Sequence, residues 1–208
     1  HPEFQKSGIG TQLIHLTKSA VGDETMVLLL SVPTAIDYYP KVGFTKENRA
    51  VARAAATQSF VLLKNSNNVL PLKKSGTVAV IGPLADNKEN MPGTWSVAAD
   101  FSKATSLLTG LKEVAGSQVK FLQARGANLD EDSLFEDRAG MFGKSLHRDS
   151  RPAAVILQEA LDIAKQSDVI IAALGESAEM SGESSSRSNI SIPQSQQDLL
   201  KALKSLNN

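Results

Sequence analysis

The sequence predicts an α/β fold in which a mostly parallel sheet lies between two layers of helices. Three apolar runs, at residues 77–83, 119–126 and 168–176, have the length and composition of buried strands. Amphipathic helical patterns alternate with these runs. Strands that are apolar throughout and alternate with helices indicate a parallel sheet covered on both faces and joined by right-handed crossovers. We therefore expect a ligand to bind beyond the carboxyl ends of the strands.

Composition excludes several classes of partner and chemistry. The 208 residues contain 22 basic and 22 acidic side chains, so no global field favours nucleic acid. The absence of cysteine removes disulfides, thiolate catalysis and cysteine-ligated metals. The longest apolar run, at residues 26–30, is too short to span a bilayer, and no secretion signal opens the chain. We expect a soluble protein with no nucleic-acid or membrane partner and no cofactor.

The first 46 residues predict a glycine turn, a helix and a strand. Gly8 and Gly10 precede apolar residues at helical spacing, and residues 26–32 have the pattern of a buried strand. Backbone N–H groups at such a helix start can bind a phosphate. The alternative is an ordinary turn without a ligand.

This segment contains two motifs, one formed by Gln5, Gly8 and Gly10 and the other by residues 35–44 (AIDYYPKVGF). Together they resemble the C-terminal half of a GNAT-type N-acetyltransferase. The resemblance implies that Gln5, Gly8 and Gly10 cradle the acetyl-CoA pyrophosphate and that Tyr39 matches a general acid. The strands that precede these motifs in that family, and supply its catalytic base, are absent from the chain, so we expect no acetylation.

From residue 47 onward, strand and helix patterns alternate. Residues 47–59 predict an alanine-rich helix, residues 60–65 (FVLLKN) a strand and residues 66–68 a turn. Three further helices are predicted at residues 106–116, 152–167 and 194–206. Their predicted inward residues are Leu107, Leu108, Leu111 and Val114; Ile156, Leu157, Ala160, Leu161 and Ala164; and Leu199, Leu200, Leu203 and Leu206.

Polar loops at the strand ends are the candidate functional segments. The loop at residues 175–193 carries Glu176, Glu179, Glu183 and Arg187 among small hydroxyl residues, so a carboxylate there could approach a hydroxyl-rich ligand. The acidic group at residues 130–137 lacks EF-hand spacing, and we expect no metal site. His147 has no partner at ligand spacing and is expected to be solvated.

From about residue 49, a series of short motifs occurs in order along the chain. They are residues 59–65 (SFVLLKN), 70–72 (LPL), 80–86 (VIGPLAD), 93–96 (GTWS), 167–169 (SDV), 175–176 (GE), and Glu183, Arg187, Ile190, Ile192, Pro193 and Gln196. In these motifs the chain resembles the C-terminal α/β sandwich domain of glycoside hydrolase family 3, especially periplasmic-type β-glucosidases.

This resemblance implies retaining hydrolysis of β-glucosides by two carboxylates. The nucleophile belongs to a separate barrel domain, and Glu183 matches the acid/base glutamate, with Glu179 and Glu176 as alternatives. Enclosure of that glutamate would raise its pKa by desolvation, which suits an acid. Trp95 matches a residue that stacks on a sugar ring, and Arg187 is either a substrate ligand or a structural partner of a carboxylate.

We therefore expect a GNAT-like fragment at residues 1–46 and a family 3 domain at residues 47–208 that stops short of the family's full sheet. Without the nucleophile domain the chain is expected to be inactive, although a barrel on another chain would make a β-glucoside its ligand. We expect the remaining sheet elements to come either from residues 26–32 or from homo-oligomerisation through sheet edges. The alternatives are an acetyl-CoA binding remnant and a chimeric scaffold without activity. Relatives are periplasmic or secreted.

Overall fold

The computed structural model describes residues 11–12, 15–16, 19, 49–96, 99–139, 146–183, 185–186 and 188–206. The chain divides into two compact units, His1–Leu70 and Pro71–Asn208, which we describe separately. The predicted strand at residues 26–32, the second GNAT-like motif, and Gln5, Gly8 and Gly10 all lie outside the described residues.

The described part of the first unit contains the predicted alanine-rich helix, but residues 60–65 do not form the strand predicted for them. Helix α2 spans Arg49–Ser59, and the short 3₁₀ helix η4 (Ser66–Asn68) occupies the predicted turn. The strand prediction at residues 60–65 is wrong. No strand pairs with this segment in the described part of the unit, and Phe60 and Leu63 are 81% and 91% exposed. A β-rich sequence needs a neighbouring strand to complete its hydrogen bonds.

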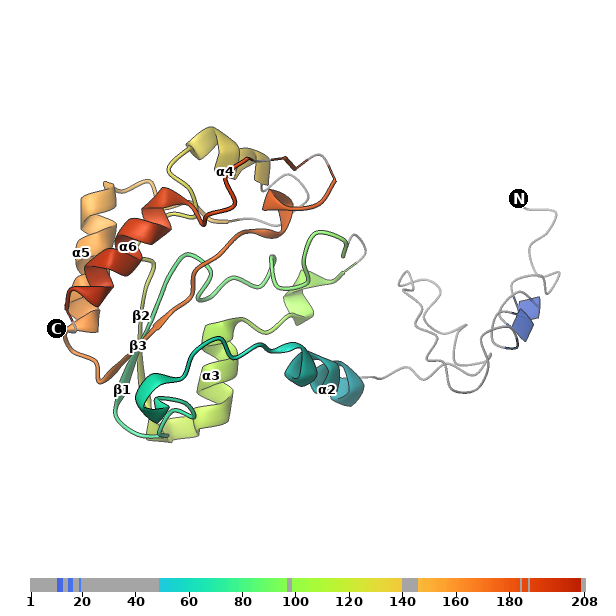
Figure 1. Cartoon of the computed structure of the whole chain (residues 1–208), viewed down its shortest axis with the longest axis horizontal. Helices are drawn as coiled ribbons and strands as arrows, with labels where there is room; N and C mark the ends of the chain where they lie inside the picture. The colour runs from blue at the N-terminus through green and yellow to red at the C-terminus, as the bar shows by residue number, and fades with distance from the viewer. Residues whose placement is uncertain are drawn as a thin grey trace. The chain divides into compact units, whose positions relative to one another are not determined.

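The second unit is built on three parallel strands, as predicted (Figure 1). They are β1 (Thr77–Ile81), β2 (Lys120–Ala124) and β3 (Val169–Ala172), in the order β2-β1-β3. In the register, Val80 of β1 lies between Gln123 of β2 and Ile171 of β3. The central strand carries the most buried residues, because it has a strand on either side and helices on both faces.

Helices cover both faces of the sheet. Helix α3 (Leu107–Ala115) packs on one face, and α5 (Ala153–Ala164) and α6 (Gln194–Lys204) pack on the other (Figure 1). A helix that was not predicted, α4 (Ser133–Ala139), lies within the loop after β2. Single 3₁₀ turns complete the described elements, and these are η5 (Phe101–Lys103), η6 (Gly116–Gln118) and η7 (Ala178–Met180).

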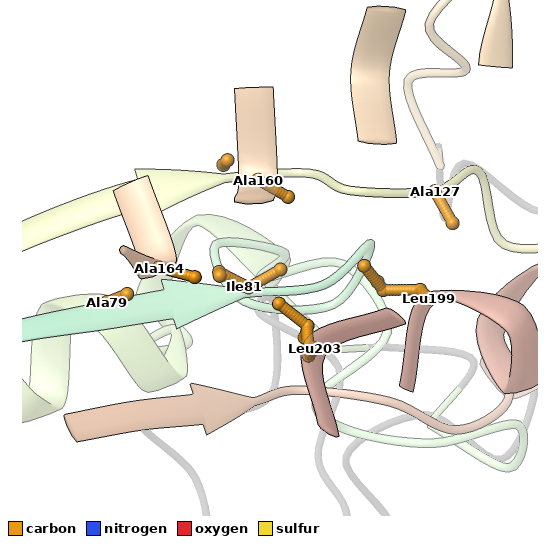
Figure 2. Close-up of a cluster of buried hydrophobic side chains, with 8 residues drawn as sticks. Ala79, Ile81, Ala127, Ala160, Ala164, Leu199 and Leu203 are labelled. Carbon is orange, nitrogen blue, oxygen red and sulfur yellow. The ribbon is translucent and has the colours of Figure 1, made fainter. Parts of the chain in front are cut away.

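The larger core cluster joins β1 and β2 to the inward sides of α5 and α6, as Figure 2 shows. Leu199 and Leu203 of α6 are buried against Ile81 and Ala160, as predicted. The prediction that Leu200 faces inward is wrong, because it follows Leu199 by one position, about 100° around the helix, and is 45% exposed.

A smaller cluster lies on the other face, under α3. Leu108 is buried there against Val78 and Val80, and Leu111 packs at its margin. Leu107 and Val114 were predicted on the same face but are 38% and 59% exposed. In the described part of the chain, the apolar stripe of α3 is therefore only partly covered by the sheet.

Gly82 is the point at which the strands converge at their carboxyl ends. Its φ is +139°, and a Cβ atom would lie 2.1 Å from the carbonyl oxygen of Ala173, just beyond β3. Its N–H donates a hydrogen bond to the carbonyl oxygen of Ala124 at 3.1 Å. Only glycine fits this position. Because the three strands are parallel, the loops that follow them lie at this same edge of the sheet.

Candidate functional site

Three loops meet at the carboxyl edge of the sheet. We call them the β1 loop (residues 82–106), the β2 loop (residues 125–152) and the β3 loop (residues 173–193). Ligands of open parallel sheets bind at this edge. The candidate residues of the sequence analysis that the structure describes lie on the β1 and β3 loops.

Glu183 lies on a turn of the β3 loop. The N–H of Ser185 donates to the carbonyl oxygen of Gly182 at 3.2 Å, which closes the turn around Glu183. The hydroxyl of Ser185 also donates to the carbonyl oxygen of Glu179 at 2.8 Å. Glu183 is exposed, whereas Glu176 and Glu179 are half-buried. Of the three glutamates, Glu183 is the most open to a ligand, and the described residues do not provide the enclosure expected around it.

Trp95 lies on the neighbouring β1 loop and is 67% exposed. The residue before it, Thr94, contacts the carbonyl oxygen of Ala178 and that of Ser181, the latter at 2.8 Å. The segment that carries the tryptophan is thereby joined to the segment that leads to Glu183. Arg187, the other predicted substrate ligand, lies outside the described residues.

Gln196 anchors the base of the β3 loop, and sequence reasoning missed this role. The side chain is completely buried at the start of α6. It accepts from the N–H of Gly175 at 2.9 Å and donates to the carbonyl oxygens of Gly175 and Leu129 at 2.8 Å and 2.7 Å. One amide therefore ties the β3 loop to the β2 loop. Two signals were available in the sequence, namely the place of Gln196 among the family 3 motif residues and its position in the first turn of a predicted helix.

The acidic group of the β2 loop has structural partners. Asp132 accepts from the N–H groups of Leu134 and Phe135 and so caps α4. Glu136 is buried, accepts from the N–H of Asp130 and pairs with Arg148. Among the described residues, no group of acidic and histidine side chains is arranged to hold a metal ion.

His147 contacts the β1 loop. The side chain is exposed, and its Nε2 lies 3.9 Å from Oε1 of Glu89. Its backbone φ is +48°. The expected solvation is observed, but the contact with Glu89 was not predicted.

Ionisable groups at the base of the β2 loop are held in salt bridges. A hydrogen bond from Arg151 lowers the pKa of Asp149 to about 2, and the same bond, with a second one to Glu159, raises the pKa of Arg151. Burial lowers the pKa of Arg125. Arg125 donates to Oδ1 of Asn128 at 2.9 Å and to the carbonyl oxygen of Leu146 at 2.9 Å, so it joins the beginning of the β2 loop to its later part.

A shallow cavity of about 430 Å³ opens between the β2 and β3 loops and the start of α6. Its lining is polar and includes Asp130, Glu131, Ser186, Asn189 and Gln197.

Among the described helices, none combines the length and apolar character that crossing a membrane requires.

Comparison with known proteins identifies the family. The family model of the glycosyl hydrolase family 3 C-terminal domain matches residues 60–208. The chain belongs to glycosyl hydrolase family 3. Within this family it is 45% identical over 157 residues to the periplasmic beta-glucosidase of Salmonella typhimurium, covering 76% of this chain and 20% of that protein. It is also 30% identical over 177 residues to a beta-xylosidase of Formosa agariphila, covering 82% of this chain and 22% of that protein.

Solved structures of family 3 enzymes share the fold. A beta-glucosidase from Listeria innocua, crystallised with glucose, matches with a TM-score of 0.58 and 30% identity, over 81% of this chain and 20% of that one. The family 3 beta-glucosidase of Bifidobacterium adolescentis matches with a TM-score of 0.54 and 27% identity, over 93% and 23% of the two chains. This chain spans about a fifth of the length of these relatives. The comparisons support the family 3 resemblance, while nothing in them bears on the GNAT-like motifs.

Proposed function

We propose that this chain is the acid/base domain of a retaining β-glucosidase, with Glu183 as the proton donor. The observation that carries the proposal is the position of Glu183, an exposed carboxylate at the carboxyl edge of a family 3 sheet, on a turn joined to the segment that presents Trp95. Family membership supplies the reaction class, since the Salmonella and Listeria relatives are named beta-glucosidases.

In this proposal the Glu183 carboxylic acid protonates the glycosidic oxygen as the leaving group departs. The resulting carboxylate then removes a proton from the water that hydrolyses the glycosyl-enzyme. The nucleophilic carboxylate comes from a barrel domain, as the family resemblance implies. Because both carboxylates must flank the anomeric carbon, the 208 residues alone give no appreciable turnover.

The other two glutamates of the β3 loop are weaker candidates. Glu176 and Glu179 are half-buried. Glu179 also lies on η7, the short element that the β1 loop contacts through Ala178. A proton donor must reach the glycosidic oxygen of a bound sugar, which favours Glu183.

Trp95 offers an exposed aromatic face to the apolar face of a pyranose ring, and Arg187 is proposed as a ligand for sugar hydroxyls. We propose a terminal β-glucoside as the substrate. A β-xyloside is the competing substrate, because the Formosa relative is named a beta-xylosidase.

The outer edge of β3 is proposed as the contact between two copies of the chain. In the described part of the chain, β3 pairs only with β1, so half of its backbone groups face outward. The other edge strand, β2, carries the exposed polar residues Lys120 and Gln123, whereas β3 (Val-Ile-Ile-Ala) has no polar side chain. Polar side chains are typical of a protected edge, and their absence favours pairing.

The acetyl-CoA site predicted at Gln5, Gly8 and Gly10 stays a prediction. Titration calorimetry with CoA tests it directly, and the absence of binding heat at about millimolar CoA would refute the prediction.

A segment exchange tests the function. Residues 60–208 replace the matching segment of the Salmonella relative, so that a nucleophile-bearing barrel is present. We expect the exchanged enzyme to hydrolyse an aryl β-glucoside and its Glu183→Gln variant to lose about 10²- to 10⁴-fold in kcat. Glu176→Gln and Glu179→Gln are matched controls with smaller losses. An exchanged enzyme that is inactive on every glycoside, or unaffected by Glu183→Gln, would refute the proposal.

A further inference from the structure

Two polar side chains of the β1 loop hold the backbone of the β3 loop just before Glu183. The first is Asn90, whose Oδ1 accepts from the N–H of Ala178 at 2.9 Å. Its Nδ2 donates to Oδ1 of Asn87 at 2.8 Å. Asn87 is 6% exposed and also accepts from the N–H of Asn90 at 2.9 Å. Because Asn87 holds both the backbone and the amide of Asn90, the amide is fixed with its oxygen toward Ala178.

The second side chain is Thr94. Its hydroxyl contacts the carbonyl oxygens of Ala178 and Ser181, so it spans the whole of η7. A hydroxyl has one proton to donate, and two acceptors at one oxygen keep it bound whichever carbonyl receives the proton. The β1 loop thus holds both ends of a single 3₁₀ turn.

Gly182 shows how closely the two loops approach one another. A Cβ atom at this position would lie 2.7 Å from Cγ2 of Thr94, and the φ of the residue is +106°. Both the contact and the backbone conformation therefore require glycine. Glu183 is the next residue, so the contact between Gly182 and Thr94 also restricts where the backbone of Glu183 can lie.

We infer that Asn90 and Thr94 are positioning residues for Glu183, and that the sugar-binding segment around Trp95 thereby sets the location of the proton donor. Trp95 directly follows Thr94, just as Glu183 directly follows Gly182. A sugar that orders the β1 loop through Trp95 also orders the turn that carries Glu183. The meaning for catalysis rests on the proposed function, but the positional link exists in the chain itself and can be measured without turnover.

Hydrogen–deuterium exchange on the 208-residue chain measures the link. The variants are Asn90→Ala, Thr94→Val and Thr94→Ser. Ser102→Ala is a control on the same loop, where the Ser102 hydroxyl donates a hydrogen bond to Asp100, a neighbour on the same short segment. We expect Asn90→Ala and Thr94→Val to raise exchange over residues 177–186 about tenfold, because each removes hydrogen bonds that hold this segment. Thr94→Ser keeps the hydroxyl and should exchange as the wild type does, and β1 should be unchanged in all variants.

A second measurement reports on the position of residue 183 itself. The chain has no cysteine and one tryptophan, so a Glu183→Cys variant can be labelled uniquely with bimane, which tryptophan quenches at short range. Quenching by Trp95 should fall when Asn90→Ala or Thr94→Val is added and should be retained with Thr94→Ser.

Each outcome decides the inference. Unchanged exchange in both Asn90→Ala and Thr94→Val overturns it, and so does faster exchange with undiminished quenching, since the loop would then loosen without moving residue 183. If Asn90→Ala fails to fold, the comparison of Thr94→Val with Thr94→Ser decides alone. Neither readout uses catalysis, so a failure of Glu183 as the proton donor is seen separately in the segment-exchange enzyme.

Discussion

The hydroxyl oxygen of Thr94 lies 2.8 Å from the carbonyl oxygen of Ser181, across 87 residues of sequence. This contact joins the loop after β1 to the loop after β3 at the edge of the sheet where ligands of α/β proteins bind. It also brings the segments of Trp95 and Glu183 together, although nothing in the sequence around Thr94 or Ser181 indicates that these two residues are in contact. The candidate site is therefore a product of the parallel topology, which places the two loops side by side.

Replacement of Leu199 by alanine should destabilise the second unit strongly. Leu199 is 1% exposed and packs in the larger core cluster, so Leu199→Ala is expected to cost about 2–5 kcal/mol of unfolding free energy. Leu200→Ala is the matched control on the same helix, and since Leu200 is 45% exposed it should cost under about 1 kcal/mol. Urea denaturation measures both, and equal costs would contradict the assigned inward face of α6.

Removal of Arg151 should change how stability depends on pH. Arg151 holds the pKa of Asp149 at about 2, below its ordinary value of 3.8. A carboxyl whose pKa is lowered by folding contributes stability above its unfolded pKa and loses it as the pH falls through the folded pKa. Arg151→Gln should therefore be less stable than the wild type near about pH 6, and the difference should shrink between about pH 4 and pH 2.

Chemical denaturation across that pH range checks the prediction. Lys201→Gln is the control, because Lys201 pairs with Asp198 on an exposed helix surface, where a salt bridge contributes little. The unfolding free energies of Arg151→Gln and the wild type could instead differ by the same amount from about pH 6 to pH 2. That result would show that the ion pair with Asp149 is not the source of the difference.

Trp95 fluorescence should report sugar binding. Trp95 is the sole tryptophan, so all the tryptophan emission of the chain comes from this residue, which is 67% exposed. A β-glucoside that stacks on the indole should change the emission at about millimolar concentration, as expected for a weak ligand held on one face. Sorbitol at equal concentration is the control, and an identical response to sorbitol would contradict stacking.

The mass of the chain in solution tests the β3 edge. We expect a concentration-dependent dimer by light scattering, which Ala172→Lys should weaken because a lysine at the exposed end of β3 discourages strand pairing. A strict monomer at all concentrations would refute edge pairing.

The sequence predicted the sheet and its covering helices because their signals are local. The three strands are short apolar runs, and Ile156, Ala160 and Ala164 lie at helical spacing on one face of α5. Local pattern failed where a neighbour decides the outcome. Residues 60–65 have strand composition but no partner strand in the described part of their unit.

The site could be predicted only in outline. The polar loop at the end of β3 and its three glutamates are visible in the sequence, and so is Trp95 within its motif. The contacts that arrange them are not visible, because Asn90 and Thr94 are neutral residues whose partners lie 84 to 88 positions away. Helix α4 was missed for a related reason, since its seven residues begin at a cap by Asp132 inside a long polar loop.

The chain alone should not hydrolyse an aryl β-glucoside, because it carries the proposed proton donor without the nucleophile. A chromogenic assay checks this with Glu183→Gln as the control for contaminating enzyme. Turnover that depends on Glu183 would contradict the proposed division of the two carboxylates between domains.

The size of the Glu183→Gln effect on different leaving groups shows whether Glu183 is the proton donor. In the segment-exchange enzyme, a proton donor matters for a poor leaving group such as an alkoxide and little for dinitrophenolate, which departs without protonation. We expect Glu183→Gln to lower kcat/KM by about 10²- to 10⁴-fold for an alkyl β-glucoside and far less for the dinitrophenyl β-glucoside. Equal losses for the two substrates, or a selective loss with Glu179→Gln instead, would contradict it.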